Sequence, residues 1–582
     1  MSQLRLSNVS FRYQTQPEDE AAVDDVSIEI DAGSFVGVTG ASESGKATLC
    51  RLLSGQIPHF YNGELSGEVT VDDAVISDHS IGELSAKIGY VFENPYDQLT
   101  GATSTVLEEV AFGLESYGLG REEMREQARE ALATIGIEDL ADRHPQQLSG
   151  GQCQRVAIAS VLAMKPEIFI LQQPTAQLDP EGSKEVFDVV SKMNDEGYTV
   201  VIVSQELERL VPYLDRLVYM ENGKIELDGT PPTVLTRAVE ADFPITIPVP
   251  VDIGHRLRES GLIPESEPVP ITSDECLAEL RRSTTTPTST VENTRSPQEP
   301  ENRDTPEISA LDAQPDGGVT VDIDDLHHRY ENGIEALSGV SMSLEHGCVC
   351  LIGQNGAGKS TLIKHLNGLL SPTKGTVCIR GKDTRNHSVA QLAHDVGLSF
   401  QNPDDQLFHS SVEEEVKYGP RNLGYDEQEV ATKTEWALEM FGLVDRRTEN
   451  PYDFGDAWRK RVAAASVVAM DTPIVVLDEP TSGQDAPGQE SLSDAVEALV
   501  DRGKLVVVIT HDMDFVREHA DRTILLAQGT VIADGETRAI LSDKKTLARS
   551  NVLPPTVMEL GLELGVGPVL STDDLLKAIG AE

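Results

Sequence analysis

The sequence predicts an α/β fold that occurs twice in tandem, with a mostly parallel sheet and a small C-terminal tail in each copy. Three observations support this prediction. The chain has 582 residues, which is too long for one hydrophobic core. Matching motifs recur at an offset of roughly 310 residues. Runs typical of buried strands, such as 199–203 and 504–509, alternate with amphipathic segments typical of helices.

The second copy contains the string GQNGAGKST at 353–361, directly after the apolar run 348–352. This order of strand, glycine-rich loop and helix is that of the GxxxxGK[ST] phosphate-binding loop. Its glycines let backbone N–H groups turn towards phosphates, its lysine supplies a point charge, and Ser360 offers a hydroxyl to Mg²⁺. We therefore predict an ATP and Mg²⁺ site. The predicted nucleotide-binding residues of this loop are Gly353, Asn355, Gly356, Gly358, Lys359, Ser360 and Thr361.

Further polar residues of the second copy follow strand-like runs. Asp478 and Glu479 end the run 474–477, His511 follows 505–510, and Gln401 follows 396–400. In this order the motifs closely resemble the ATP-hydrolysing domains of the ABC type. The resemblance implies two P-loop domains of that type, each with a helical subdomain.

The resemblance also implies a role for each residue. Asp478 would hold Mg²⁺ through water, with Ser360 and Gln401 on the same metal, and Glu479 would orient or deprotonate the attacking water. His511 is similar to the switch histidine that contacts the γ-phosphate. Tyr330 is similar to the aromatic residue that stacks on adenine, although an ordinary packing role is the alternative for both Tyr330 and Tyr13.

The first copy keeps these motifs but has lost their chemistry. In the string GASESGKAT at 40–48, alanine replaces the hydroxyl residue that binds Mg²⁺, so metal binding there is doubtful. A glutamate replaces a glycine and would repel the triphosphate by roughly 3 kcal/mol per charge pair at about 5 Å and an effective ε of about 20, unless it points to solvent. The residues of this degenerate site are Tyr13, Glu43, Lys46, Ala47, Glu93, Gln172, Gln173 and Gln205.

In ABC dimers each nucleotide lies between the phosphate loop of one domain and the signature motif of the other. The first copy has the intact signature LSGGQ, whereas the second has FGDAW, with Gly455 in place of serine and Asp456 in place of a glycine. This crosswise pattern predicts one complete ATP site and one failed site, because random decay would not also remove the opposite signature. We expect the two domains to pair within one chain. The residues that the first copy would contribute to the complete site are Ser149, Gly150, Gly151, Gln152 and the D-loop residue Asp179.

The basic run 459–461 is interpreted as a solvated helix face that holds local acids.

Composition limits the possible partners. The formal net charge is −50 and the pI is near 4.5, so the surface repels nucleic acid and suits a salt-rich cytoplasm, as in a halophile. Six scattered cysteines favour a reducing compartment. No apolar run approaches the roughly 20 residues that cross a bilayer, so a membrane role requires a partner.

The repeat predicts five segments: a degenerate nucleotide-binding domain at 1–240, its tail at 241–282, a disordered acidic linker at 283–318, the competent domain at 319–546, and its tail at 547–582. Ser/Thr residues followed by acidic residues predict short capped helices in both tails.

A more specific resemblance lies after Gln401. The strings FQNPDDQLF at 400–408 and VEEEV at 412–416 are echoed at 92–99 and 107–113. They resemble the ATPase subunits of energy-coupling-factor importers, which include cobalt and vitamin carriers. The resemblance implies a peripheral protein on the cytoplasmic face of the membrane, bound to an integral membrane scaffold and a small substrate-binding membrane protein. A plain surface turn is the alternative for the Asn-Pro-Asp-Asp stretch.

Two other functions stay open. A soluble tandem ABC ATPase that acts on ribosomes would also have two such domains, but it should have a basic surface. A nucleotide-sensing clamp without turnover would need neither Glu479 nor His511.

Overall fold

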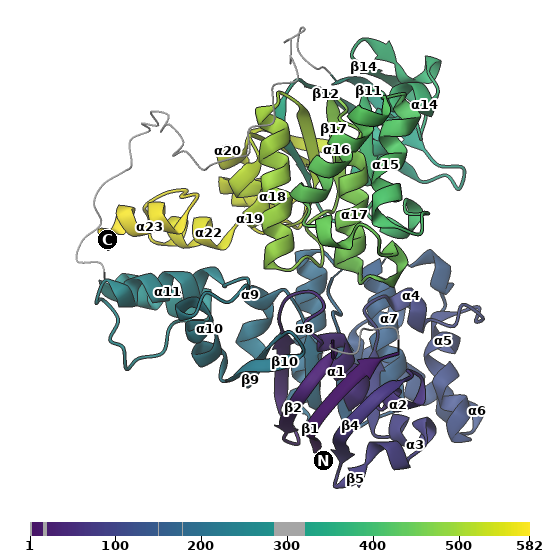
Figure 1. Cartoon of the computed structure of the whole chain (residues 1–582), viewed down its shortest axis with the longest axis vertical. Coiled ribbons are helices and arrows are strands. Elements are labelled where there is room, and N and C mark those ends of the chain that lie inside the picture. The colour runs from purple at the N-terminus through teal and green to yellow at the C-terminus, as the bar shows by residue number, and fades with distance from the viewer. Residues whose placement is uncertain (1–2, 15–19, 149, 177, 284–320, 582) are drawn as a thin grey trace. The chain divides into compact units, whose positions relative to one another are not determined.

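The computed structural model describes residues 3–14, 20–148, 150–176, 178–283 and 321–581 (Figure 1). The chain forms two compact units that meet in the sequence at Cys276 and Leu277. Ser283 is the last residue of a tail helix, and the remainder of the predicted linker lies outside the described residues.

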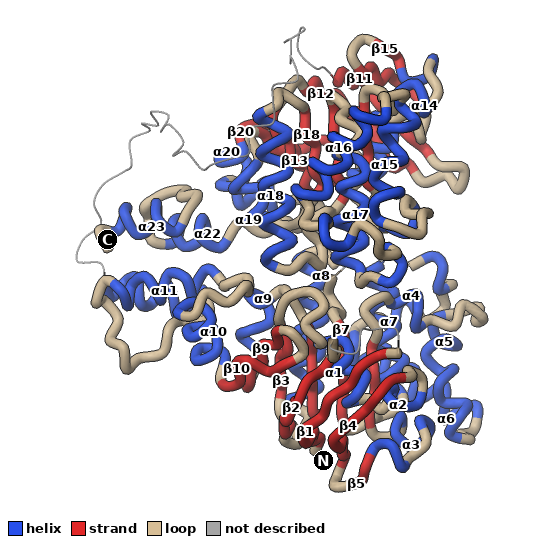
Figure 2. Tube along the Cα trace, in the orientation of Figure 1, coloured by secondary structure: helices blue, strands red, loops and turns tan. Residues whose placement is uncertain are grey.

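A six-stranded, mostly parallel sheet forms the centre of each unit (Figure 2). In the second unit, the strand order is β16-β17-β18-β13-β19-β20, and only β20 runs antiparallel to its neighbour. The first unit repeats this arrangement as β6-β7-β8-β3-β9-β10. The strands of the second unit are β13 (Gly347–Ile352), β16 (Val396–Ser399), β17 (Ile474–Asp478), β18 (Leu505–Ile509), β19 (Arg522–Ala527) and β20 (Thr530–Glu536). Those of the first are β3 (Phe35–Thr39), β6 (Ile88–Val91), β7 (Ile168–Gln172), β8 (Thr199–Val203), β9 (Arg216–Glu221) and β10 (Lys224–Gly229). The predicted fold class is confirmed.

A smaller antiparallel sheet packs beside each central sheet, with the order β2-β1-β4-β5 in the first unit and β12-β11-β14-β15 in the second. Its strands are β1 (Leu4–Tyr13), β2 (Val23–Ile30), β4 (Gly63–Val71) and β5 (Ala74–Val75), and β11 (Val321–Arg329), β12 (Glu335–Leu344), β14 (Lys374–Ile379) and β15 (Lys382–Asp383). The sequence did not lead us to predict these sheets.

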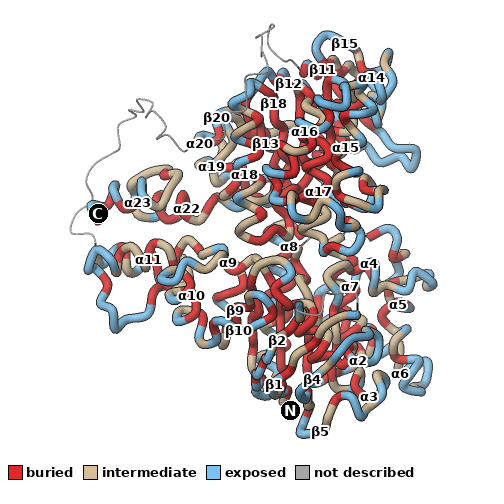
Figure 3. Tube along the Cα trace, viewed as in Figure 1, coloured by how far each residue is buried: buried red, intermediate tan, exposed pale blue. Residues whose placement is uncertain are grey.

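The strands of each central sheet are mostly buried (Figure 3). Two hydrophobic cores enclose this sheet in each unit, because alternate strand residues point to opposite faces. In β17, Val475 and Leu477 join the core under the helices, whereas Ile474 and Val476 join the core under the antiparallel sheet. Burial on both faces explains why these strands are apolar throughout.

The helices repeat in the same order. Those of the first unit and its tail are α1 (Lys46–Leu53), α2 (Gln56–His59), α3 (Ile81–Ser85), α4 (Pro95–Gln98), α5 (Val106–Phe112), α6 (Arg121–Ile135), α7 (Gly150–Ala163), α8 (Pro180–Asp195), α9 (Leu207–Leu210), α10 (Pro231–Glu240), α11 (Val249–Glu259) and α12 (Ser273–Ser283). Those of the second are α13 (Lys359–Leu366), α14 (Val389–Leu392), α15 (Val412–Leu423), α16 (Glu427–Met440), α17 (Asp456–Val468), α18 (Ala486–Asp501), α19 (Met513–His519), α20 (Thr537–Ser542), α21 (Lys544–Ala548), α22 (Thr556–Glu563) and α23 (Thr572–Ile579). The predicted tail helices are confirmed, and the Ser571 hydroxyl caps α23 by accepting from Asp574 N. None of the helices that the structure describes combines the length and apolar character that a membrane span requires.

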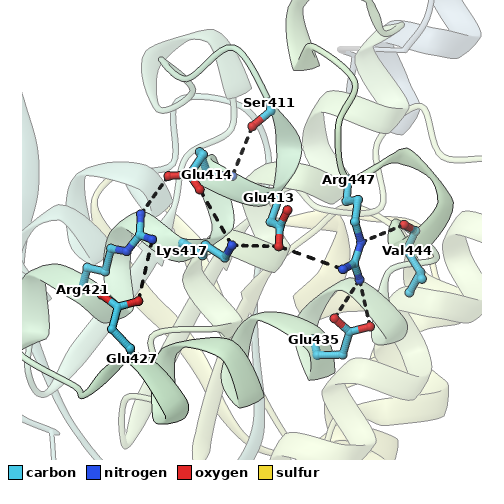
Figure 4. Close-up of polar contacts among 9 residues, drawn as sticks. All are labelled: Ser411, Glu413, Glu414, Lys417, Arg421, Glu427, Glu435, Val444 and Arg447. Carbon is cyan, nitrogen blue, oxygen red and sulfur yellow. Dashed lines mark hydrogen bonds and ion pairs between the residues drawn. The ribbon is translucent and has the colours of Figure 1, made fainter.

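Shared ion pairs reinforce the helical subdomain of the second unit, which comprises α15, α16 and α17 (Figure 4). Each of three cations faces two carboxylates, as expected where acidic residues outnumber basic ones. The pairs join Lys417 to Glu413 and Glu414, Arg421 to Glu414 and Glu427, and Arg447 to Glu413 and Glu435, at 2.7–4.0 Å. They connect α15 to α16 and to the turn that follows α16.

Candidate active site

The phosphate loop of the second unit curves around the ammonium group of its own lysine. Gly353 and Gly358 have φ angles of 143° and 102°, which glycine adopts readily and other residues do not. A Cβ on Gly358 would also lie 2.6 Å from the carbonyl oxygen of Ala336. Lys359 Nζ donates hydrogen bonds to the carbonyl oxygens of Gly353 and Gln354. The loop therefore places a buried cation at the start of a helix, an arrangement that suits phosphate.

A tyrosine is tied to the same helix. Tyr330 directly follows β11, and its hydroxyl lies 3.0 Å from Thr361 Oγ1 in the first turn of α13. The side chain of Tyr330 is 37% exposed, so part of the ring is accessible for stacking on a base.

Ser360 and Asp478 form a pair that fits a magnesium ion. The Ser360 hydroxyl donates to the Asp478 carboxylate, and burial together with the neighbouring Glu479 raises the pKa of Asp478 to about 6. Among the described residues, Asp478 Oδ1 is buried and has no hydrogen-bond partner. Hydroxyl and carboxylate oxygens are ligands that Mg²⁺ prefers, and a cation would offset the cost of the buried charge.

Glu479 and His511 meet at the ends of two neighbouring strands, β17 and β18. His511 Nδ1 lies 2.8 Å from Glu479 Oε2. Glu479 is buried and has a left-handed φ of 51°, a conformation that proteins retain mainly at functional positions. Burial disfavours the Glu479 carboxylate, but His511 and Lys359 together outweigh this, and the pKa of Glu479 lies below its usual value. The pair thus provides an ionised, oriented carboxylate of the kind that serves as a general base.

The loop after β16 is fastened by Gln406, whereas Gln401 on the same loop is exposed. Gln406 Oε1 accepts from Phe400 N at 3.1 Å, and its Nε2 donates to Ala463 O and Ser466 Oγ of α17 at 2.9 Å. In the part of the chain that the structure describes, the Gln401 side chain makes no hydrogen bond. The loop that would bring Gln401 to the metal is therefore attached to the signature helix of its own unit.

Glu415 fastens the next stretch of chain. Its buried carboxylate accepts hydrogen bonds from the backbone N–H groups of Phe408 and His409, at 2.9 and 2.7 Å. In the first unit, Gln98 bonds to Phe92 N and Ala157 O as Gln406 does in the second, and Glu109 accepts from the backbone N–H and the hydroxyl of Thr100. Sequence reasoning assigned no role to these two glutamines and two glutamates, although their recurrence at matching places in both copies was a usable signal. The Asn-Pro-Asp-Asp stretch itself forms a short turn in which Asn402 accepts from Asp404 N, and Gln406 fastens the residues that follow it.

The signature helix of the second unit begins with its own carboxylate. Asp456 is the first residue of α17, and its side chain pairs with Lys460 at 3.1 Å and Arg459 at 3.7 Å. Arg459 also pairs with Asp404 at 2.8 Å. The expectation that 459–461 holds local acids is confirmed for Arg459 and Lys460, but the expectation of a solvated face is wrong, because Lys460 and Arg461 are buried. The place where this helix would receive a phosphate oxygen carries a negative charge.

The phosphate loop of the first unit keeps its backbone shape. Gly40, Glu43 and Gly45 have φ angles of 143°, 63° and 97°. Glu43 therefore adopts the left-handed conformation of a glycine, and its side chain is exposed, which reduces the repulsion expected against a triphosphate. Lys46 donates to the carbonyl oxygens of Gly40 and Ala41, and burial lowers its pKa to about 8.

At the place where the second unit has its candidate metal ligands, the first unit has amide and phenol groups. Gln172, in the place of Asp478, donates through Nε2 to Glu93 Oε2 at 3.2 Å and accepts from the Tyr90 hydroxyl at 2.5 Å. Since Ala47 supplies no hydroxyl, these side chains satisfy one another and offer no orphaned carboxylate to a cation.

The catalytic pair of the first unit is also absent. Gln173 keeps the left-handed backbone of Glu479, with a φ of 43°. Gln205, in the place of His511, donates instead to the carbonyl oxygen of Gly40 at 2.8 Å. The Tyr13 hydroxyl lies 3.1 Å from Thr48 Oγ1, and it accepts a hydrogen bond from Arg51 Nη1 at 2.8 Å.

The signature of the first unit lies at the start of α7. Gly150, Gly151 and Gln152 form its first turn, and Ser149 lies outside the described residues. Asp179 caps α8 by accepting from Gly182 N at 2.9 Å, which fixes the loop before that helix.

Comparisons with known proteins agree with this architecture. The family model described as "ABC transporter" matches residues 23–176 and 337–482. A protein named as an ABC transporter ATP-binding protein from Methanosarcina acetivorans is 36% identical, over 97% of this chain and 90% of the relative. One from Caldanaerobacter subterraneus subsp. tengcongensis is 34% identical, over 96% of both chains. The solved structure of cbiO1 from Clostridium perfringens, part of the ABC transporter complex cbiONQ, is 28% identical and matches 43% of this chain and 97% of that chain, with a TM-score of 0.37.

Proposed function

Because this chain belongs to the ABC transporter family, as an ATP-binding protein with ATPase activity, we propose that it energises an importer of the energy-coupling-factor type. It would act at the cytoplasmic face of the membrane, bound to an integral membrane scaffold and a small substrate-binding membrane protein. The cargo would be a small solute, either a vitamin or a transition metal ion, and nucleic acid is not a partner.

One observation carries the proposal of a single competent site. The base and its histidine, Glu479 and His511, lie in the second unit, whose own signature helix begins with Asp456. The first unit has glutamines at the catalytic positions, but its signature helix begins with Gly150. We infer that the phosphate loop of the second half and the signature of the first half, paired within one chain, form the site that turns over.

The residues of this site have separate tasks. Lys359 and the loop N–H groups bind the phosphates, and Tyr330 stacks on the base. Ser360, Asp478 and Gln401 would hold Mg²⁺, which neutralises charge on the phosphate oxygens when bound. Glu479 takes a proton from water as the water oxygen attacks the γ-phosphorus, the bond to the leaving oxygen breaks, and ADP and phosphate result. His511 orients Glu479, and Ser149 with the N–H groups of Gly150 and Gly151 stabilises the γ-phosphate oxygens.

The importer subgroup is supported by the string that follows Gln401. Gln406 and Glu415 attach this loop to α17 and to the start of α15, so a push on the loop would be transmitted to the signature helix. Gln98 and Glu109 build the same attachment in the first half. Such a loop suits a domain that must couple nucleotide state to a membrane partner.

The single-site proposal predicts that Gln173→Glu will not create a second active site. Ala47 and Gln172 still provide no ligands for the metal. Asp456 still places a negative charge in the signature that would pair with the phosphate loop of the first unit. We expect steady-state ATPase turnover to stay within about twofold of the wild-type value, since one added carboxylate restores one of several missing parts. A doubled rate, lost again on adding Lys46→Ala, would contradict the proposal.

We also propose that the chain works in a salt-rich cytoplasm, because of its net charge of −50. Salt shortens the screening length from about 10 Å at 0.1 M to about 3 Å at 1 M, which weakens self-repulsion of the surface. We expect the melting temperature and the ATPase rate to rise between 0.1 and 2 M KCl. A melting temperature that falls over this range would show that ion pairs such as those of Lys417 and Arg447 matter more than the net repulsion.

The importer proposal can be tested by affinity purification of the full chain from detergent-solubilised membranes of its host at high salt. Recovery of a helical membrane scaffold together with a small hydrophobic protein would support it and would identify the substrate-binding component. Recovery of ribosomal proteins, or of the chain alone from the soluble fraction, would favour a soluble ABC ATPase instead.

A further inference from the structure

Two buried histidines lie behind Tyr330 in the second unit. His365 is fully buried in α13, and its Nδ1 lies 2.8 Å from the carbonyl oxygen of Thr361. Its Nε2 lies 3.2 Å from Nδ1 of His328, a buried residue of β11, and His328 Nδ1 also lies 3.2 Å from the carbonyl oxygen of Ser371. The pair thus bridges the strand that leads to the predicted adenine-stacking residue and the helix that begins at the phosphate loop.

The chemistry of these contacts fixes the proton positions. A carbonyl oxygen can only accept, so His365 Nδ1 carries a hydrogen. Burial lowers the pKa of His365 to about 4, so its Nε2 is unprotonated at neutral pH and accepts from His328 Nδ1. His328 shares the same hydrogen with Ser371. Each imidazole therefore donates from Nδ1 to a backbone carbonyl oxygen, and His365 Nε2 accepts from His328.

The histidines complete a closed ring of contacts. The Tyr330 ring packs edge-on against His328, with centroids 4.7 Å apart and an angle of 80°. The Tyr330 hydroxyl reaches Thr361 Oγ1, and the Thr361 carbonyl oxygen accepts from His365. Tyr330 is therefore fixed at both its ring and its hydroxyl to groups that themselves contact the first turns of α13.

The first unit has the same geometry without the histidines. Phe11 stands two residues before Tyr13, as His328 does before Tyr330, and Leu52 stands six residues after Lys46, as His365 does after Lys359. Phe11 and Leu52 are buried, and Phe11 packs edge-on against Tyr13 at 4.8 Å and 86°. An apolar pair thus fills this place in the half without catalytic residues. Two buried imidazoles have a desolvation cost that a phenyl ring and a leucine in the same place do not have. In return, the two histidines form a directional hydrogen bond that the apolar pair cannot form.

We propose that His328 and His365 are positioning residues for ATP, which fix the Tyr330 ring relative to the phosphate loop so that base and phosphates are bound in one geometry. This inference rests on the stacking role that the proposed function gives Tyr330. Since the pair contacts neither the reacting atoms nor the metal ligands, its effect falls on ATP binding and not on the chemical step.

The test compares steady-state ATPase kinetics of full-length variants. The double variant His328→Phe with His365→Leu copies the pair of the first unit and so preserves packing. We expect it to raise KM for ATP about three- to tenfold, as for the loss of one or two hydrogen bonds, with kcat within about twofold. His365→Asn, whose amide nitrogen can take the place of Nδ1 and keep the bond to Thr361 while the bond to His328 is lost, should raise KM less than the double variant.

Three outcomes would overturn the proposal. An unchanged KM in the double variant would show that the pair does not act on the nucleotide. A parallel fall in kcat and melting temperature with unchanged KM would assign it a purely structural role. Tyr330→Ala serves as the reference, because an unchanged KM in that variant would show that the stacking role itself is wrong. Wild-type protein without ATPase activity would instead point to failure of the proposed function.

Discussion

Replacing Glu479 by Gln is expected to reduce ATP turnover by about 10² to 10⁴, the usual effect of losing a general base. Glutamine keeps the shape of the side chain but cannot take a proton from water. The carboxylate that it replaces is buried, has a pKa below its usual value and lies 2.8 Å from His511 Nδ1, in the position proposed for the base. ATP binding should persist, because Lys359 and the loop N–H groups are unchanged.

The measurement combines steady-state phosphate release with retention of labelled ATP on the purified chain. Glu479→Gln should retain uncleaved ATP, with the domains held closed. Gln173→Ala, the matched change in the first unit, should leave the rate within about twofold of wild type, because the neutral amide of Gln173 cannot take a proton from water. Turnover near the wild-type rate in Glu479→Gln would rule out the assigned base and with it the single-site mechanism.

The positions of Glu479 and His511 could be predicted from the sequence because parallel strands place their carboxyl ends at one edge of a sheet. Glu479 and His511 follow strands that the apolar pattern revealed, and these strands are neighbours in the sheet. The phosphate loop was equally predictable, since its glycines and lysine form a local structure. The antiparallel sheet was missed because buried and exposed residues alternate within its strands, and because β11 pairs with β14, which is distant in the sequence.

Side-chain directions and contacts between distant segments were not predictable. The sequence placed Glu43 in the phosphate loop, but only the fold shows that its side chain is exposed. Gln406 reaches α17, and His365 reaches β11, across segments whose proximity depends on the whole unit. Each residue also has an ordinary surface or core interpretation in isolation. The His328 and His365 pair was visible only as two histidines in separate elements.

On the proposed crosswise pairing, the start of each signature helix decides which site can turn over. In the second unit, Asp456 occupies this position and is paired with Lys460. In the first unit, the corresponding residue is Gly150, and Gln154 stands in the place of Lys460. A helix start attracts phosphate through its exposed N–H groups, and a carboxylate at the same position competes for them and repels the anion.

Gly150→Asp is therefore expected to reduce turnover about 10²-fold, because a carboxylate about 5 Å from a phosphate charge costs about 3 kcal/mol at an effective ε of about 20. Gly150→Asn has nearly the same shape without the charge, so the difference between the two variants measures the electrostatic part. Asp456→Gly is the matched change in the second unit, and it should alter the rate by no more than about twofold, since the site opposite it lacks a base. If Asp456→Gly were the damaging variant and Gly150→Asp the silent one, the crosswise assignment would be wrong, and each unit would have to be considered as acting with its own signature.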